Sequence, residues 1–226
     1  MLALDLALAV ATLICGAWLA RDRDNPRWGL TIAIAATCLA LHVVLIELPR
    51  NVPAAQLLGG FWNWTGKLLG FAGCLLFVPL VDPADRRRWL RLPAWDPLVH
   101  LGLAAVAVLA FVVSLAIGDS IPFSADTIAF QLVIPTLDEE LLYRGILLSL
   151  LVQATRSRAA PIWITAVLFG LAHLTLASIE PLNFFRTFGY GLVFAWLTVR
   201  CDGSLVPAAI LHSSINVLPY LAQMLL

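Results

Sequence analysis

Long apolar segments alternate with short polar stretches along the 226-residue chain. Each segment is close to the about 20 apolar residues with which a helix crosses a bilayer, whereas a membrane-spanning strand needs only ~9–11 alternating residues. A helix also satisfies its own backbone hydrogen bonds in lipid. The pattern predicts an all-α, polytopic membrane helix bundle with about eight transmembrane helices. We expect these helices over residues 2–20, 28–47, 57–81, 97–118, 127–152, 161–179, 182–200 and 203–225.

The composition agrees with a protein that is embedded in a membrane. Apolar residues make up 61% of the chain and charged residues only 12%, against averages of ~45–50% and ~25% in globular proteins. The mean hydropathy is +0.92. This composition excludes a soluble globular enzyme. The formal net charge is zero, so nothing indicates a nucleic-acid partner. The cysteines have no zinc-type spacing, and we interpret them as small core residues: Cys15, Cys38, Cys74 and Cys201.

The basic residues indicate how the chain is oriented. One set of alternate loops carries ten arginines, whereas the other carries Arg50, Lys67 and Arg186. Because basic loops stay in the cytoplasm, both termini should face outward. The first segment has no positive start and no small-residue cleavage site, so it predicts a retained anchor rather than a signal peptide. We expect a multi-pass protein of a prokaryotic cytoplasmic membrane.

Two regions can be separated along the chain. Residues 1–96 predict an N-terminal membrane region of three helices and a basic cytoplasmic loop, and residues 97–226 contain helices four to eight. The ionisable residues of the first region receive no chemical role. Asp5 and Glu47 lie near segment ends, His42 is interpreted as a satisfied core histidine, and Lys67 either snorkels or pairs with another helix.

The fifth segment carries three acids and an arginine at its centre, in the run Asp138-Glu139-Glu140-Leu141-Leu142-Tyr143-Arg144. An ionised group at the bilayer centre costs at least ~2.5–3.5 kcal/mol, so such a cluster indicates function. Glu140 and Arg144 have the favourable i, i+4 spacing of a helical ion pair. Glu139 points about 100° away from Glu140. We therefore expect one carboxylate to be neutralised by Arg144 and the other to be free.

Two later segments add polar residues at a similar depth. His173 lies in the sixth segment, and the eighth carries His212 and Asn216 on one face at i, i+4. Counted from the cytoplasmic ends at 1.5 Å per residue, these residues and Glu139 lie roughly 14–20 Å deep. Side chains from three helices at one depth can converge into a site.

A carboxylate and a histidine that share one water can act as general bases in hydrolysis. A second histidine and an asparagine can stabilise the oxyanion that forms when a carbonyl is attacked. The alternative is a zinc site in which Glu139, His173 and His212 are ligands. The sequence has neither an H-E-x-x-H helix nor a G-x-S-x-G elbow. We expect no cofactor, with zinc as the alternative.

The motifs resemble those of the CAAX protease and bacteriocin-processing (CPBP) family. Its E-E-x-x-x-R motif corresponds to residues 139–144, F-x-x-x-H to 169–173 and H-x-x-x-N to 212–216, and the resemblance covers about residues 125–222. It implies an intramembrane protease of the glutamic type that is similar to type II CAAX prenyl endopeptidases. Glu139 and His173 would activate the water, and His212 and Asn216 would hold the oxyanion. Glu140 and Arg144 would support the site.

The resemblance also implies what such a protease would act on. The substrate would be a membrane-associated protein or peptide that is lipidated or carries a C-terminal sorting signal. Two other functions stay open from the residues alone. One is an ion-coupled transporter in which the acids and histidines relay protons. The other is a factor that binds a peptide without cutting it, as in bacteriocin immunity.

Overall fold

The computed structural model describes residues 10, 14, 26–58, 61–93, 96–117, 124–155, 157–176 and 181–223, and all the regular elements in these residues are helical. The prediction of an all-α protein is confirmed. The elements are α2 (Pro26–Asn51), η1 (Pro53–Ala55), α3 (Trp64–Leu75), η2 (Val78–Leu80), α4 (Pro83–Arg86), α5 (Pro97–Ile117), α6 (Ala125–Glu139), η3 (Glu140–Leu147), α7 (Leu148–Thr155), α8 (Ala159–Leu176), α9 (Pro181–Arg200) and α10 (Val206–Gln223).

Each predicted segment from residue 28 onward contains a long helix, whereas the segment at 2–20 lies almost entirely outside the described residues. The segment predicted at 57–81 is the main difference. Its helix α3 begins only at Trp64, because the Asn63 side chain accepts a hydrogen bond from Gly66 N and caps the helix there. The helix ends at Leu75, and the short turn η2 follows. Apolar composition alone does not reveal such a cap.

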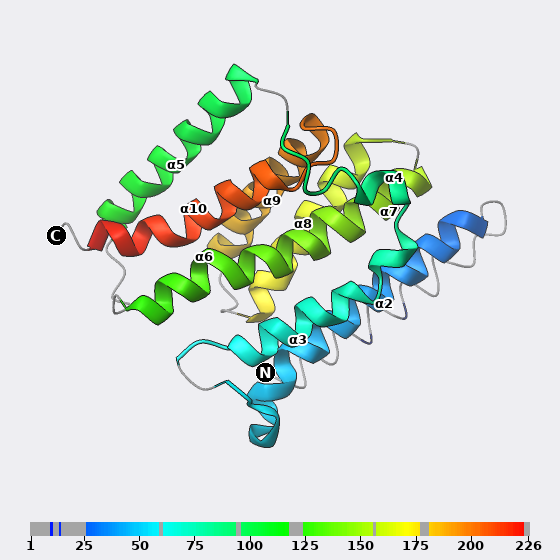
Figure 1. Cartoon of the computed structure of the whole chain (residues 1–226), viewed down its shortest axis with the longest axis horizontal. Helices are drawn as coiled ribbons and strands as arrows, with labels where there is room; N and C mark the ends of the chain where they lie inside the picture. Colours follow the sequence, from blue (N-terminus) through cyan, green and yellow to red (C-terminus); the bar gives the residue numbers. More distant parts are fainter. Residues whose placement is uncertain are drawn as a thin grey trace.

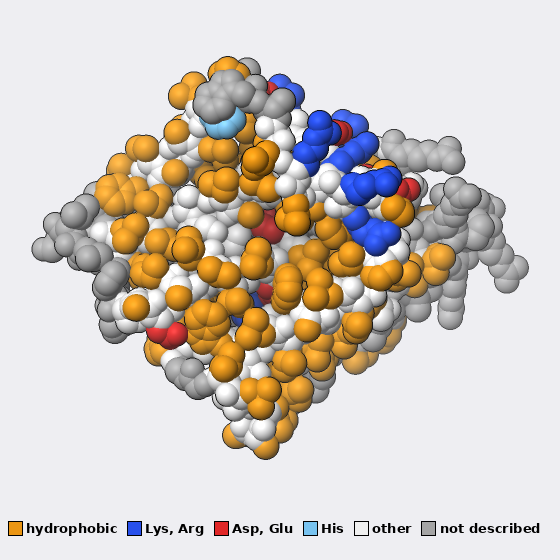
Figure 2. All heavy atoms as spheres, in the orientation of Figure 1, with side chains coloured by type: hydrophobic (Ala, Val, Ile, Leu, Met, Phe, Trp, Pro, Cys, Tyr) orange, Lys and Arg blue, Asp and Glu red, His pale blue; other side chains and the backbone are white. Residues whose placement is uncertain are grey.

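The number of membrane spans stays a prediction. Among the described residues one helix, Trp28–Asn51, is long and apolar enough to cross a bilayer, and several shorter helices are also apolar. Figure 2 shows apolar side chains spread over the visible face of the molecule. Leu101 on α5, Leu132 on α6 and Leu182 on α9 are exposed. Apolar surface of this extent is typical of a protein that contacts lipid or a partner.

The continuous α6–η3–α7 rod runs through the middle of the bundle (Figure 1). Helices α2 and α3 form a pair on one side, and α3 packs on α6. Helix α10 packs on α6 from the other side and is covered in turn by α5. Helices α8 and α9 pack on each other and on η3. The rod carries the best-buried core residues, among them Leu142, Ile146 and Leu147.

Close contact between α2 and α3 depends on three glycines of α3. Gly66, Gly70 and Gly73 recur at helical spacing, and a Cβ atom at Gly66 would lie only 2.3 Å from the backbone oxygen of Ile46. Small residues at such spacing let two helices approach closely. Lys67 lies about 100° around α3 from Gly66. Its side chain reaches α6, as described below.

Basic side chains gather at one end of the bundle, over α4 and the end of α7 (Figures 1 and 2). Arg88 and Arg158 line one cavity there. Arg88 also pairs with Asp202 just beyond α9, at 3.7 Å. These residues belong to the loops that the charge pattern assigns to the cytoplasm. The outward orientation of the two termini stays a prediction.

Candidate active site

The three acids lie where α6 passes into the π-helical stretch η3, a kind of helix that occurs frequently at functional sites. All three side chains are buried inside the bundle. Pro135 within α6 lacks a backbone N–H, so it interrupts the regular ladder one turn earlier. Ser213 of α10 donates a hydrogen bond to Leu132 O at 2.8 Å and contacts Thr136 Oγ1 at 3.0 Å. These bonds hold α10 beside the acid cluster.

Glu140 lies in a buried polar network through its Oε1, whereas its Oε2 has no hydrogen-bond partner among the described residues. Its Oε1 accepts a hydrogen bond from Arg144 Nη1 at 3.2 Å and lies 2.7 Å from His212 Nδ1. The Arg144 guanidinium lies over the ring of Phe169, at 4.4 Å, and over the ring of Phe194, at 4.9 Å. Its Nη2 contacts Gly191 O at 3.5 Å. The predicted pair between Glu140 and Arg144 is confirmed.

Glu139 has a different environment for each of its two oxygens. Oε1 accepts a hydrogen bond of 2.6 Å from Lys67 Nζ on α3. Oε2 lies 3.9 Å from His173 Nε2 and 3.7 Å from His212 Nε2 and has no hydrogen-bond partner among the described residues. The expectation of a wholly free carboxylate is therefore wrong for Oε1, because α3 packs along α6 and brings its lysine to the acid.

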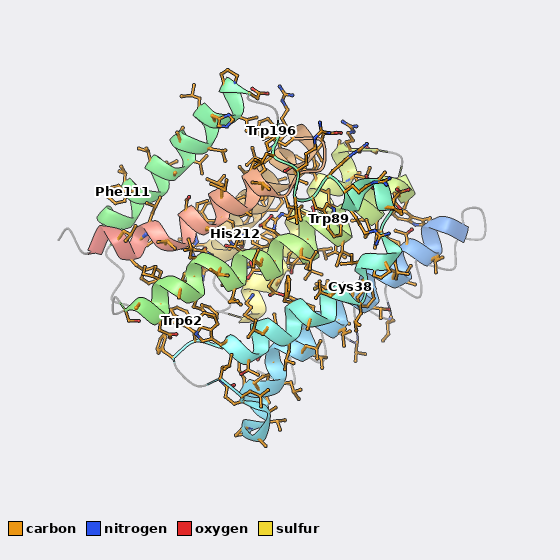
Figure 3. The ribbon with its side chains drawn as sticks, viewed as in Figure 1. Cys38, Trp62, Trp89, Phe111, Trp196 and His212 are labelled. Atoms are coloured by element: carbon orange, nitrogen blue, oxygen red, sulfur yellow. The ribbon has the colours of Figure 1, made fainter. Side chains whose placement is uncertain are left out.

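Aromatic rings and backbone atoms fix both histidines. His173 Nδ1 lies 2.8 Å from Phe169 O, one turn earlier on α8, and the two rings are 4.5 Å apart. The imidazole of His212 stacks on Phe194 of α9, with centroids 4.9 Å apart and planes 21° apart. Figure 3 labels His212 on α10, towards the middle of the bundle. The spacing F-x-x-x-H thus has a structural reason, since the phenylalanine supplies both a ring and a carbonyl.

Asn216 lies one turn beyond His212 on α10 and is partly buried. Within the described part of the chain no side chain forms a hydrogen bond with its amide. Of the four predicted catalytic residues, the structure thus brings Glu139, His173 and His212 together. Asn216 is on the same helix as His212 but forms no hydrogen bond with the other three in the described structure.

Residues 121–218 match the protein-family model described as type II CAAX prenyl endopeptidase Rce1-like. This segment of the chain is similar to the Rce1-like family. The match confirms the resemblance that the three motifs indicate, and the matched family is described as one of CAAX prenyl endopeptidases. Comparisons with curated proteins and with solved structures gave no match. Helices α2 and α3 lie outside the matched Rce1-like segment.

Sequence reasoning gave no chemical role to several residues that contact the acid cluster. Lys67 Nζ lies 3.2 Å from Asp138 Oδ2 as well as close to Glu139. His42 Nδ1 lies 3.4 Å from Asp138 Oδ1 and 3.5 Å from Cys74 Sγ. One signal could have singled out the lysine. Lys67 is the only lysine in the sequence, and it lies within an apolar segment.

The site can also be tested against a zinc ion, which is the alternative to metal-free hydrolysis. Ligand atoms bound to one tetrahedral zinc at ~2.0–2.1 Å lie roughly 3.4 Å from one another. The gaps of 3.7 and 3.9 Å between Glu139 Oε2 and the two histidines are wider. In the described residues, His42, Cys74 and Asp138 are the three ligands within 4.8 Å of one another. In this geometry Glu139, His173 and His212 do not form a compact set of zinc ligands.

A groove lies between α6 and α10, next to the acid cluster. Its volume is about 520 Å³, and most of its lining is apolar, including Leu137 and Val217. Thr136 and Ser213 also line it. Thr136 lies one helical turn before Glu139 on α6, and Ser213 directly follows His212 on α10. An apolar chain in this groove would lie beside the polar site.

Proposed function

We propose that this protein is an intramembrane endopeptidase that hydrolyses a peptide bond without a covalent intermediate. One observation carries the proposal. Oε2 of Glu139 is buried, lacks a hydrogen bond in the described structure, and faces the Nε2 atoms of His173 and His212 across 3.9 and 3.7 Å. Polar atoms at such separations are commonly bridged by water. The family match independently supports a peptidase.

The hydrogen bonds of His173 explain how such a water would be activated. A backbone carbonyl only accepts hydrogen bonds, so Nδ1 of His173 carries the proton that it shares with Phe169 O. Nε2 of the neutral ring is then an acceptor. Glu139 Oε2 is an acceptor too. A water that donates to both directs an oxygen lone pair away from them, and Glu139 takes its proton as the oxygen attacks the carbonyl carbon.

The side of the site around Glu140 and His212 would stabilise the negative charge that develops on the substrate's carbonyl oxygen. Nδ1 of His212 lies 2.7 Å from the Glu140 carboxylate and donates to it. In the proposed mechanism the ring also carries a proton on Nε2. Nε2–H of that ring and the amide of Asn216 would donate to the oxyanion. When the tetrahedral intermediate collapses, the carbon–nitrogen bond breaks. The proton held by Glu139 passes to the leaving amine, and the carboxylate is restored.

The substrate we propose is a membrane-associated protein or peptide, cut near a segment that carries an apolar group or a C-terminal sorting signal. The apolar groove between α6 and α10 supports this proposal, because an apolar segment could lie there beside Glu139. A prenylated C-terminal peptide is the first substrate to test, since the family is described by that activity. We place the protein in a prokaryotic cytoplasmic membrane with both termini outside.

The test is cleavage of a fluorogenic prenylated peptide by the purified protein in lipid nanodiscs. Glu139→Gln should lower kcat about a thousandfold or more, because the general base is lost. Glu47→Gln is the matched control, since Glu47 is also buried but pairs with Arg50 on α2. It should keep wild-type turnover. Full turnover by Glu139→Gln would overturn the assignment. In cells, membrane proteomics of this variant should find proteins with uncut C-termini.

Metal dependence is measured separately. We propose that no metal is required, so activity should persist after chelation, with less than about 0.1 zinc per protein, a stoichiometry far below that of a structural or catalytic site. Recovery of activity only when zinc is added back would support the zinc alternative. A transporter would be indicated by ion flux into liposomes that continues in Glu139→Gln.

A further inference from the structure

We propose that Lys67, which lies outside the Rce1-like segment, is a positioning residue for Glu139. The inference rests on the proposed function and extends its site to the N-terminal helices. The lysine would fix one oxygen of the carboxylate, so that the other faces the two histidines. The site would then be assembled from two regions of the chain, of which only one carries the family motifs.

The contacts of Lys67 are those of a buried ion bridge. Its side chain is 13% exposed, and its ammonium group contacts Glu139 Oε1 at 2.6 Å and Asp138 Oδ2 at 3.2 Å. A buried charge is costly unless it is paired. Here one cation serves two adjacent acids. No other lysine occurs in the sequence, so the ion bridge draws on a residue type that the chain otherwise lacks.

Several contacts hold α3 in the register that this bridge needs. Trp62 Nε1 donates to Thr127 Oγ1 at 3.1 Å, and its ring stacks on Phe130 of α6 at 5.1 Å. Trp64 Nε1 donates to Asp126 Oδ1 at 2.9 Å. Figure 3 shows Trp62 beside the beginning of α6. The start of α3 is thus anchored to the start of α6, and the lysine reaches the acids near the end of α6.

Asp138 has a different role in this arrangement from Glu139. It is fully buried, and its Oδ2 accepts a hydrogen bond from Lys67. Its Oδ1 lies 3.4 Å from His42 Nδ1 and has no hydrogen-bond partner among the described residues. Asp138 therefore holds the ammonium group in place from the side opposite the site.

The bridge determines where Glu139 Oε2 points. The terminal torsion of a glutamate has broad preferences, so a free carboxylate rotates readily. A short hydrogen bond to Oε1 removes that freedom and leaves Oε2 directed at His173 and His212. Pre-orientation of a reacting group accelerates the chemical step more than it improves substrate binding. Loss of the lysine should therefore lower kcat with little change in KM.

The experiment compares Lys67→Met and Lys67→Arg in nanodiscs with the prenylated peptide. Lys67→Met should lower kcat about a hundredfold, with KM within about threefold. Lys67→Arg keeps a cation that can bridge both acids, so it should retain kcat within about tenfold of the wild type. Arg50→Met is the matched control, because it removes a cation from an ion pair on α2 away from the site. It should keep kcat.

Equal kcat in Lys67→Met and the wild type would overturn the inference, and so would equal losses in Lys67→Met and Lys67→Arg at unchanged melting temperature. If Lys67→Met does not fold, Lys67→Gln replaces it, and wild-type kcat in that neutral variant overturns the inference equally. The outcome is distinct from failure of the proposed function. That failure would appear as cleavage that survives in Glu139→Gln, independent of the results with the Lys67 variants.

Discussion

The two sides of the acid cluster differ although they are built around adjacent glutamates. The closed side surrounds Glu140 with Arg144 and His212, and both of these side chains are almost fully buried. The open side surrounds Glu139, where the His173 side chain is 29% exposed, against 6% for His212. Neighbouring residues of one type thus serve different purposes. We propose that the closed side holds the helices in register and that the open side admits water and substrate.

We expect the largest effects on kcat from removal of either histidine, and rescue by imidazole should distinguish the open side from the closed side. His173→Ala and His212→Ala should each lower kcat by roughly a hundredfold to ten-thousandfold, because each removes a group that acts on the reacting atoms. Added imidazole should restore part of the activity in His173→Ala, since the His173 side chain is partly exposed. Imidazole should not restore the activity of His212→Ala, because the cavity that this variant leaves is buried in the closed side. Restoration of both variants by imidazole, or of neither, would contradict the comparison.

Glu140→Gln tests the closed side through stability. The substitution leaves Arg144 buried without its carboxylate, and loss of one partner from a buried ion pair costs about 3–5 kcal/mol. The measurement is unfolding in mixed micelles, with Asp202→Asn as the control. Asp202 pairs with Arg88 at the surface, so its loss should cost about 0–1 kcal/mol. A similar small cost for Glu140→Gln would show that the closed side is not a structural element.

Asn216 should contribute less to catalysis than the histidines do. Its loss should lower kcat and leave the melting temperature unchanged. Removal of one oxyanion donor typically costs about a hundredfold to a thousandfold in kcat. Asn216→Ala and Asn216→Asp should therefore both lower kcat by about a hundredfold at unchanged melting temperature, because neither supplies an amide N–H. Asn51→Ala is the control, since Asn51 hydrogen-bonds to Glu47 O on α2, away from the site. If Asn216→Asp keeps wild-type kcat, the amide does not donate to the oxyanion.

The lengths of the apolar segments predict most of the described helices, because a membrane helix requires little more than a continuous run of apolar residues. The segment at 57–81 is the exception, since α3 covers only Trp64–Leu75. The same reasoning predicted the pair of Glu140 and Arg144, whose partners lie within one turn. It also placed Glu139, His173 and His212 at a common depth. These are contacts along one helix, or between helices whose direction the charge pattern predicts.

The bridge from Lys67 to Glu139 could not be predicted in the same way. It depends on which face of α3 meets α6, and that is set by the glycines that pack α3 on α2 and by the two tryptophans before and at its start. The π-helical stretch at Glu140 was equally hidden, because the sequence pattern there resembles an ordinary helix. Contacts between distant segments depend on how side chains pack, and composition and periodicity do not reveal that packing.

Ser213→Ala should have the smallest effect, and it tests whether α10 depends on α6 for its position. Ser213 donates to Leu132 O, close to the gap that Pro135 leaves in the ladder of α6. A typical hydrogen bond contributes about 0.5–1.5 kcal/mol, so unfolding should become easier by about 1 kcal/mol. Because α10 also carries His212, kcat should fall severalfold. Ser214→Ala is the control, since the Ser214 hydroxyl donates to Ile210 O within its own helix. Equal stability and equal kcat in the two variants would show that the contact with α6 does not position His212.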